Sequence, residues 1–104
     1  MTPEGKVKKS IKDVLQPYID QGLVDGFRPV PYGYGESHLD YVGCAKGLFF
    51  CIEVKAGGKK PTPRQVLRIQ NVKKASGRVF VIDGTEKTHT VKELKTWLML
   101  TTGV

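Results

Sequence analysis

Two apolar runs on either side of a short glycine-containing turn constrain the fold of this chain more than any other feature. They span residues 41–44 and 48–54, with Lys46 and Gly47 between them. Both runs are rich in β-branched and aromatic residues, and such runs around a turn of this kind predict a β-hairpin. We therefore expect a two-residue turn centred on Lys46-Gly47, and this turn determines how the two strands pair.

This pairing brings charged residues together at the open end of the hairpin. It places Val42 opposite Cys51 and Asp40 opposite Glu53. Directly opposed residues share a face of the sheet, with Cβ atoms about 5 Å apart. Lys55 follows Glu53 by two residues, so it points to the same face. We expect the Asp, Glu and Lys side chains to converge there, whereas a one-residue bulge at the turn would shift the register and separate them.

Two facing carboxylates beside a basic loop form a pocket of hard oxygen ligands. Such pockets hold Mg²⁺ or Mn²⁺ through one or two carboxylates, with water and phosphate oxygens completing the shell. The ligands would be Asp40, Glu53 and the main-chain carbonyl of Val54. The metal would polarise a phosphodiester and lower the pKa of a bound water, while Lys55 would orient that water or stabilise the transition state. The alternative is a hairpin whose surface acids and cross-strand lysine carry no chemistry.

Three segments carry helix-start signals, each with a threonine at the N-cap position. The starts are Thr2-Pro3, Thr62-Pro63 and Thr90, and apolar residues at helical spacing follow each of them. Gln65 and Glu93 each follow such a threonine by three residues, which is the spacing of a capping box. Pro17 is expected in the last turn of the first helix or at its end, and Gly77 just after the second helix, at the C′ position.

The remaining strands complete an α/β fold. Residues 78–83 form a compact apolar strand, and residues 27–30 an edge strand, because Pro29 suits a central strand poorly. The order α-β-β-β-α-β-α predicts a single domain over residues 1–104, with a small mixed β-sheet flanked by helices and an αβββαβ core followed by a C-terminal helix. Trp97 is expected to anchor the last helix in the core, and His89 to lie on the surface in a turn.

The net charge of +7, from 17 Lys and Arg against 10 Asp and Glu, suits a polyanionic partner such as nucleic acid. Charge alone is equally compatible with a lysine-rich soluble surface. No apolar run approaches the roughly 20 residues of a membrane span, and the N-terminus lacks the apolar stretch of a signal peptide. We expect a cytoplasmic protein without a membrane partner, in which Cys44 and Cys51 are buried free thiols.

Two loops carry candidate nucleic-acid contacts. The glycine-rich connection before the hairpin contains Tyr34 and His38, which would stack on or touch a nucleic-acid strand. It is also compatible with an ordinary connection whose tyrosines cover the core. The loop after the hairpin contains Lys59 and Lys60, and Arg64 follows at the start of the second helix. These three cations would bind phosphates, so that affinity would fall steeply with salt concentration.

The stretch SHLDYVGCAKGLFFCIEVKAGGKKPTPRQ resembles the core of the PD-(D/E)XK nucleases, and in particular the virus-type replication-repair nuclease (VRR-NUC) family. That family's pattern is an Asp, a short hairpin with Gly at its turn, an IEVK strand, a basic loop, and a helix that opens with Pro-Thr and an early Gln. The matching positions here are Asp40, Gly47, residues 52–55, Lys59-Lys60, Pro61-Thr62 and Gln65. The resemblance covers residues 37–83, and Leu39 stands where the family usually has Pro.

The resemblance implies a metal-dependent DNA endonuclease. Asp40 and Glu53 would bind Mg²⁺ or Mn²⁺, Lys55 would be catalytic, and Gln65 would help to orient the site. The family often places a glutamate of its first helix near the metal, and Glu4 is the inward-facing candidate here. Gln65 also has the competing role in its capping box, and we expect one side chain not to serve both easily.

Free-standing members of the family resemble this chain in size and are typical of phages. Similar proteins act as homodimers on Holliday junctions and other branched DNA. The resemblance therefore implies a structure-selective endonuclease and a homodimer, with the Gly/Tyr loop and the last helix as candidate interfaces. One alternative is a nuclease-fold module that binds nucleic acid without cutting it, although the intact set of Asp40, Glu53 and Lys55 argues against that. A general exonuclease or a restriction-type enzyme would share the chemistry and differ in substrate.

Overall fold

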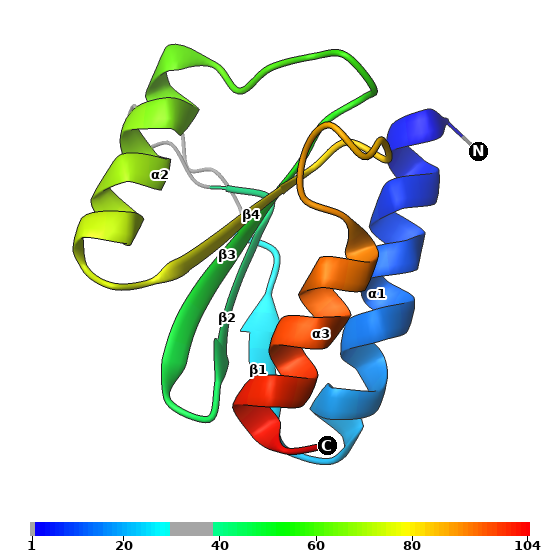
Figure 1. Ribbon diagram of the computed structural model, residues 1–104, viewed down its shortest axis with the longest axis vertical. Helices are drawn as coiled ribbons and strands as arrows, with labels where there is room; N and C mark the ends of the chain where they lie inside the picture. Colours follow the sequence, from blue (N-terminus) through cyan, green and yellow to red (C-terminus); the bar gives the residue numbers. More distant parts are fainter. Residues whose placement is uncertain (1, 30–38) are drawn as a thin grey trace.

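The computed structural model describes residues 2–29 and 39–104. Its helices and strands follow the predicted order α-β-β-β-α-β-α (Figure 1). They are α1 (Pro3–Asp20), β1 (Val24–Phe27), β2 (Tyr41–Ala45), β3 (Leu48–Val54), α2 (Pro63–Lys74), β4 (Arg78–Ile82) and α3 (Val91–Thr102). The predicted α/β class, a small mixed sheet flanked by helices with a helix after the core, is confirmed.

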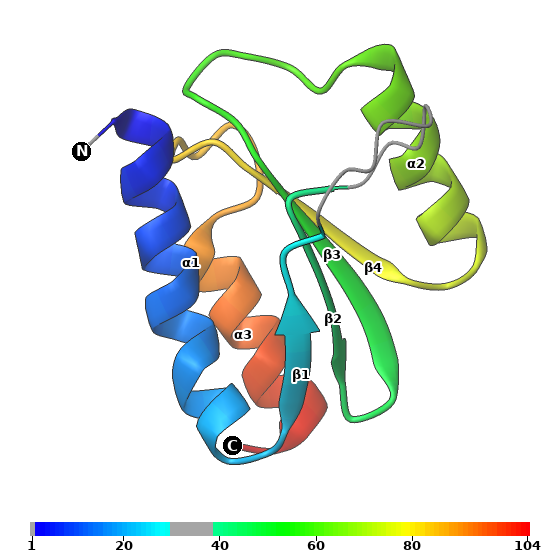
Figure 2. The same ribbon diagram turned by 180° about the vertical axis from the view of Figure 1, so that it is seen from behind.

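The four strands form one mixed sheet in the order β1-β2-β3-β4. The first three strands are antiparallel, and β4 runs parallel to β3 after the crossover through α2. Helices α1 and α3 lie side by side on one face of the sheet and α2 covers the other (Figures 1 and 2). Within the described ranges, no helix is long and apolar enough to cross a membrane.

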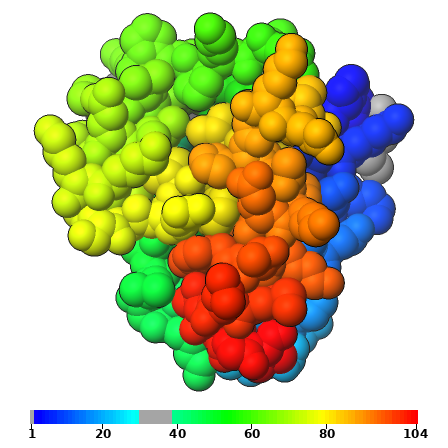
Figure 3. All heavy atoms as spheres, viewed as in Figure 1, coloured from blue at the N-terminus to red at the C-terminus, as the bar shows by residue number. Residues whose placement is uncertain are grey.

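Two hydrophobic cores lie on the two faces of the sheet. The larger core joins α1 and α3 to residues of β3 that include Phe50, Ile52 and Val54. The smaller core lies beneath α2 and includes Cys51. Because side chains alternate along a strand, Glu53 shares its face with Cys51 and points toward the α2 side. Figure 3 shows α3 near the centre of one face of the molecule, with α2 on one side of it and α1 on the other.

The hairpin has the predicted register. Val42 pairs with Cys51 and Ala45 with Leu48. The turn residues Lys46 and Gly47 both have positive φ, at 50° and 84°, as a two-residue type I′ turn requires. No bulge interrupts the pairing, so the condition on which the predicted convergence of charged residues depended is met.

Two predicted boundaries are wrong. The edge strand covers Val24–Phe27 and not residues 27–30, because Val24 is buried and pairs with Ala45 while Pro29 falls beyond the strand. Gly77 does not occupy the C′ position of α2. Ser76 does, with φ of 67°, and the Gly77 N–H bonds to the Val72 carbonyl at 2.9 Å. This bond and the one from Ser76 to Lys73 form a Schellman motif, in which a serine takes the left-handed position.

Three single-residue predictions can also be judged. His89 is not a surface turn residue: it is half-buried, and its Nδ1 accepts a hydrogen bond from the Val81 N–H at 3.1 Å. Trp97 packs against the larger core as predicted, in contact with the rings of Phe50 and Phe80. Both cysteines are free thiols, but only Cys51 is buried; Cys44 is exposed, so its predicted burial is wrong.

Candidate active site

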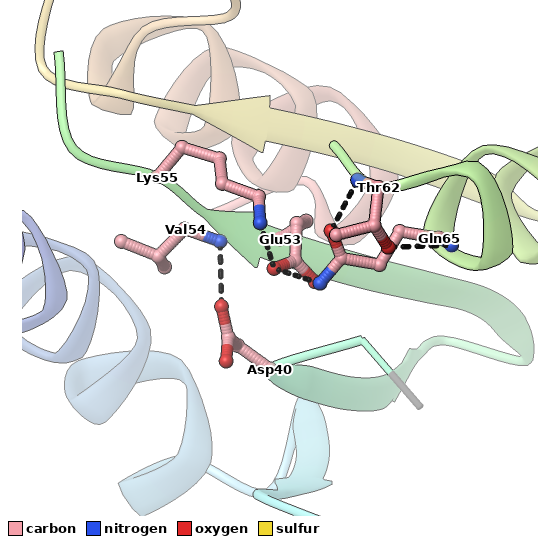
Figure 4. Close-up of polar contacts among 6 residues, drawn as sticks. All are labelled: Asp40, Glu53, Val54, Lys55, Thr62 and Gln65. Carbon is pink, nitrogen blue, oxygen red and sulfur yellow. Dashed lines mark hydrogen bonds and ion pairs between the residues drawn. The ribbon is translucent and has the colours of Figure 1, made fainter. Parts of the chain in front are cut away.

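Asp40 lies at the open end of the hairpin, directly before β2. Its Oδ2 accepts a hydrogen bond from the Val54 N–H at 2.8 Å (Figure 4). Since Tyr41 pairs with Ile52, the next position along the hairpin places Asp40 opposite Glu53. The N–H and C=O groups of one strand residue face the same neighbouring strand, and the Val54 N–H faces Asp40. The Val54 carbonyl is therefore also directed toward the Asp40 side of β3.

Glu53 is almost fully buried, with 2% of its surface exposed. Its Oε1 accepts a hydrogen bond from Gln65 Nε2 at 2.9 Å and lies 3.7 Å from Lys55 Nζ (Figure 4). Its Oε2 is buried and has no hydrogen-bond partner within the described part of the chain. A buried carboxylate oxygen without a partner is costly, so this oxygen marks a position that a cation would satisfy.

The acid–base properties of Glu53 support this interpretation. The pKa of Glu53 is raised to about 7, chiefly by burial and then by the neighbouring Asp40 carboxyl group, against the opposing effect of Lys55. Two adjacent carboxylates repel each other unless one binds a proton or both share a cation. The pair is therefore electrostatically suited to a positive ion.

Gln65 connects the first turn of α2 to this carboxylate pair. Its Oε1 accepts from the Thr62 N–H at 2.9 Å, and its backbone N–H donates to Thr62 Oγ1 at 3.3 Å, which completes the capping box. Its Nε2 is the group that donates to Glu53. The expectation that one side chain would not easily serve both was wrong, because the amide oxygen caps the helix while the amide nitrogen reaches the site.

The donor chemistry fits Mg²⁺ or Mn²⁺. No cluster of three or more His, Cys, Asp or Glu side chains that could hold a metal occurs within residues 2–29 and 39–104, so the candidate protein ligands are Asp40, Glu53 and the Val54 carbonyl. An all-oxygen set with few protein ligands is typical of Mg²⁺ sites that leave room for water and substrate phosphate. Structural zinc sites instead need four ligands that include Cys or His.

The other predicted site residues lie around the carboxylate pair or outside the described ranges. Lys59 and Lys60 are exposed in the loop after β3, and Arg64 is exposed in the first turn of α2. Tyr34 and His38 lie outside the described residues.

Glu4 is half-exposed in the first turn of α1, and among the described residues no hydrogen bond or ion pair joins it to the carboxylate pair.

Asp83 is an organising residue that the sequence reasoning missed. It follows β4 and is 7% exposed, and its Oδ1 accepts from the Thr85 N–H at 2.8 Å, from Thr85 Oγ1 at 2.6 Å and from Thr88 Oγ1 at 2.9 Å. These hydrogen bonds from Thr85, with smaller contributions from Thr88 and the Gly58 backbone, lower the pKa of Asp83 to about 2. Asp83 thus ties the loop after β4 to the basic loop after β3. An Asp followed two residues later by Thr, after an apolar strand, is the local signal of such a turn.

No protein-family model and no curated protein sequence matches the chain. A solved structure described as a VRR_NUC domain is similar to it, with a TM-score of 0.70 and 23% sequence identity. The match covers 90% of this chain and 95% of the other. The chain therefore has the fold of a VRR_NUC domain, which confirms the fold that the sequence resemblance implied.

Proposed function

We propose that this chain is a VRR-NUC family nuclease that hydrolyses phosphodiester bonds of DNA with Mg²⁺ or Mn²⁺. One observation carries the proposal: the buried Oε2 of Glu53, without a hydrogen-bond partner in the described residues, beside a second carboxylate on Asp40. A hairpin without chemistry would gain nothing from burying Glu53 beside a second, half-buried acid, Asp40. A site that binds a cation and a phosphate requires such a pair.

Asp40 and Glu53, with the Val54 carbonyl, would hold the metal. When bound, the metal supplies charge neutralisation, polarisation of the phosphodiester and a bound water of lowered pKa. The Val54 N–H keeps Asp40 in place through the 2.8 Å hydrogen bond. Gln65 likewise fixes the orientation of the Glu53 carboxylate, so the two ligands are positioned before substrate arrives.

Lys55 would act on the reacting phosphate. Its Nζ lies 3.7 Å from Glu53 Oε1, so the ammonium group is held at the edge of the carboxylate pair. From there it would orient the attacking water and stabilise negative charge on the phosphorane-like transition state. Lys59, Lys60 and Arg64 would bind phosphates along the strand, since all three lie on the segment that follows Lys55.

The finer assignments also belong to the proposal. We place the enzyme among structure-selective endonucleases acting on branched DNA such as Holliday junctions, as a phage-type protein working in the host cytoplasm. A homodimer would supply two sites for symmetric cuts. Of the two candidate interfaces, the Gly/Tyr loop lies outside the described residues, whereas α3 exposes Met99 and Leu100. Glu4 would approach the metal from α1.

A cleavage assay on duplex, flap and four-way-junction DNA tests the proposal, with Mg²⁺, Mn²⁺ or EDTA. We expect metal-dependent cutting by the wild type and a rate at least about 100-fold lower for Asp40→Asn and Lys55→Ala. Glu93→Gln, on α3, is the matched control and should cut normally. Binding without cutting would instead indicate the non-catalytic module, and equal rates for all variants would contradict the assigned site. Light scattering at micromolar concentration tests the dimer, and a monomer would refute it.

A further inference from the structure

A cavity of about 540 Å³ lies between α1 and the sheet, and Asp40 forms part of its wall. Its α1 side carries Lys8, Lys9 and Lys12, and Arg28 lies across from them after β1. These cations lie beside Asp40, one of the two proposed metal ligands. The volume falls within the range of about 300–1,000 Å³ that is typical of ligand sites.

The end of β1 creates this opening. Phe27 is the last residue of β1 and pairs with Val42, so β1 does not continue alongside Asp40 and Tyr41. Phe27 and Tyr41 both line the cavity. A Cβ on Gly26 would lie 2.6 Å from the Tyr41 ring, so the glycine allows that ring to pack directly against the backbone of β1. The ring also stacks on Phe50, which keeps it in place.

Phe27 pairs with Val42, which packs in the smaller core beneath α2, so the exposed Phe27 ring lies on the α2 face of the sheet and the cations lie on the other face. The floor of the cavity is apolar, with Ile52 and Val54 among its residues. Lys9 pairs with Asp13 at 3.0 Å, so the charge directed at a ligand comes chiefly from Lys8, Lys12 and Arg28.

Three cations along one groove beside the carboxylate pair suit the successive phosphates of a nucleic-acid strand. Figure 4 shows Asp40 and Val54 between α1, at the left, and the start of α2 with Gln65, at the right. Cations therefore flank the carboxylate pair on both sides. Lys8, Lys12 and Arg28 lie on the α1 side, and the basic loop after β3 lies on the α2 side.

We propose that the cavity lined by Lys8, Lys12 and Arg28, here termed the α1 groove, holds the DNA strand on one side of the cleaved phosphate. The lysines and Arg28 bind successive phosphates. This assignment rests on the proposed nuclease function and extends it, because it fixes the path of the strand across the site from α1 to α2.

The first test measures DNA binding in EDTA, so that it does not depend on cutting. Lys8→Ala/Lys12→Ala is compared with Lys73→Ala/Lys74→Ala, which removes the same charge at the far end of α2. Fluorescence anisotropy with a labelled four-way junction is recorded from 50 to 200 mM salt. We expect the α1-groove variant to bind about tenfold more weakly and the slope of log K against log salt to fall by about 1.4 to 1.8. The control should keep both values close to those of the wild type.

The second test uses cleavage kinetics. In cleavage assays the Lys8/Lys12 variant should raise KM with kcat preserved, because these lysines bind the strand without touching the reacting atoms.

The outcomes separate the two proposals. If both double variants lose the same affinity and slope, or if the Lys8/Lys12 variant lowers kcat and leaves KM unchanged, the α1 groove is refuted while the nuclease assignment stands. If the wild type binds but never cuts with metal, the nuclease assignment fails and the binding data still decide the groove. If the wild type binds no DNA at all, both are overturned.

Discussion

Replacing Glu53 with glutamine should stabilise the metal-free protein at alkaline pH, although it removes a proposed metal ligand. The folded-state pKa of Glu53 is about 7, against 4.5 for the free side chain. A carboxyl group whose pKa is raised by folding contributes stability below the unfolded value of 4.5, and this contribution is lost as the pH rises through 7. One pKa unit corresponds to about 1.4 kcal/mol. Ionisation of Glu53 therefore costs about 2 to 3 kcal/mol between pH 5 and pH 8.

The assay is urea denaturation in EDTA at pH 5 and at pH 8, for the wild type and Glu53→Gln. The difference in unfolding free energy between the two proteins cancels the other titrating groups. From pH 5 to pH 8, the unfolding free energy of Glu53→Gln should rise relative to that of the wild type by about 2 to 3 kcal/mol. Glu93→Gln, an exposed change of the same chemistry on α3, should show a shift within about 0.5 kcal/mol.

A shift for Glu53→Gln no larger than that of Glu93→Gln would refute the reasoning. It would mean that the buried carboxylate is already compensated, and that the Oε2 of Glu53 has a partner in solution. A shift of opposite sign would mean that Lys55, at 3.7 Å, stabilises the ionised form more than burial and Asp40 destabilise it. Either result would remove the main support for a cation site.

Further predictions concern the end of α2, the loop after β4 and metal binding at the carboxylate pair. Ser76→Gly should raise the unfolding free energy by about 1 kcal/mol in urea titrations, because serine holds a φ of 67° there. Gly77→Ala should lower the unfolding free energy by about 1 to 3 kcal/mol, since the added Cβ would lie 2.6 Å from a side-chain carbon of Val72. If the two substitutions changed the unfolding free energy in the same direction and by the same amount, this account would be wrong. The pKa of Asp83 is about 2 in the folded protein, against 3.8 for the free side chain, so its ionised form stabilises the fold above pH 3.8 and this contribution is lost toward pH 2. The difference in stability between the wild type and Asp83→Asn should therefore narrow from pH 3.8 to pH 2. Acid titration followed by circular dichroism measures it. Mn²⁺ at about 100 times its Kd should add about 2.7 kcal/mol to the wild type at pH 8 but not to Asp40→Asn, and EDTA should reverse the gain.

The parts of the fold that could be predicted are those that neighbouring residues decide. The turn Lys46-Gly47 and the alternation around it determine the register of the hairpin, and with it the meeting of Asp40 and Glu53. The threonine N-caps mark the starts of the helices for the same reason, since each cap satisfies backbone groups within three residues.

The parts that could not be predicted depend on which element comes to lie next to which. β4 is an edge strand, so the Val81 N–H needs a partner from outside the sheet, and His89 supplies it. Nothing in the local sequence around His89 indicates that bond. The α1 groove likewise arises only because β1 ends at Phe27 and α1 packs beside the gap. In both cases the sequence contains the residues concerned, but it does not indicate which residues they contact in the folded protein.

The identity of residue 65 shows how the fold and the site constrain each other. A capping box accepts either glutamate or glutamine at its third position, so the helix alone does not distinguish them. The site does, because the side chain must accept from the Thr62 N–H with one atom and donate to Glu53 with another. Of these two side chains, glutamine has both an acceptor and a donor, whereas ionised glutamate has acceptors alone. A glutamate would cap α2 equally well but would add a third carboxylate beside Asp40 and Glu53, so the electrostatics of the site, and not the stability of the helix, select glutamine at this position.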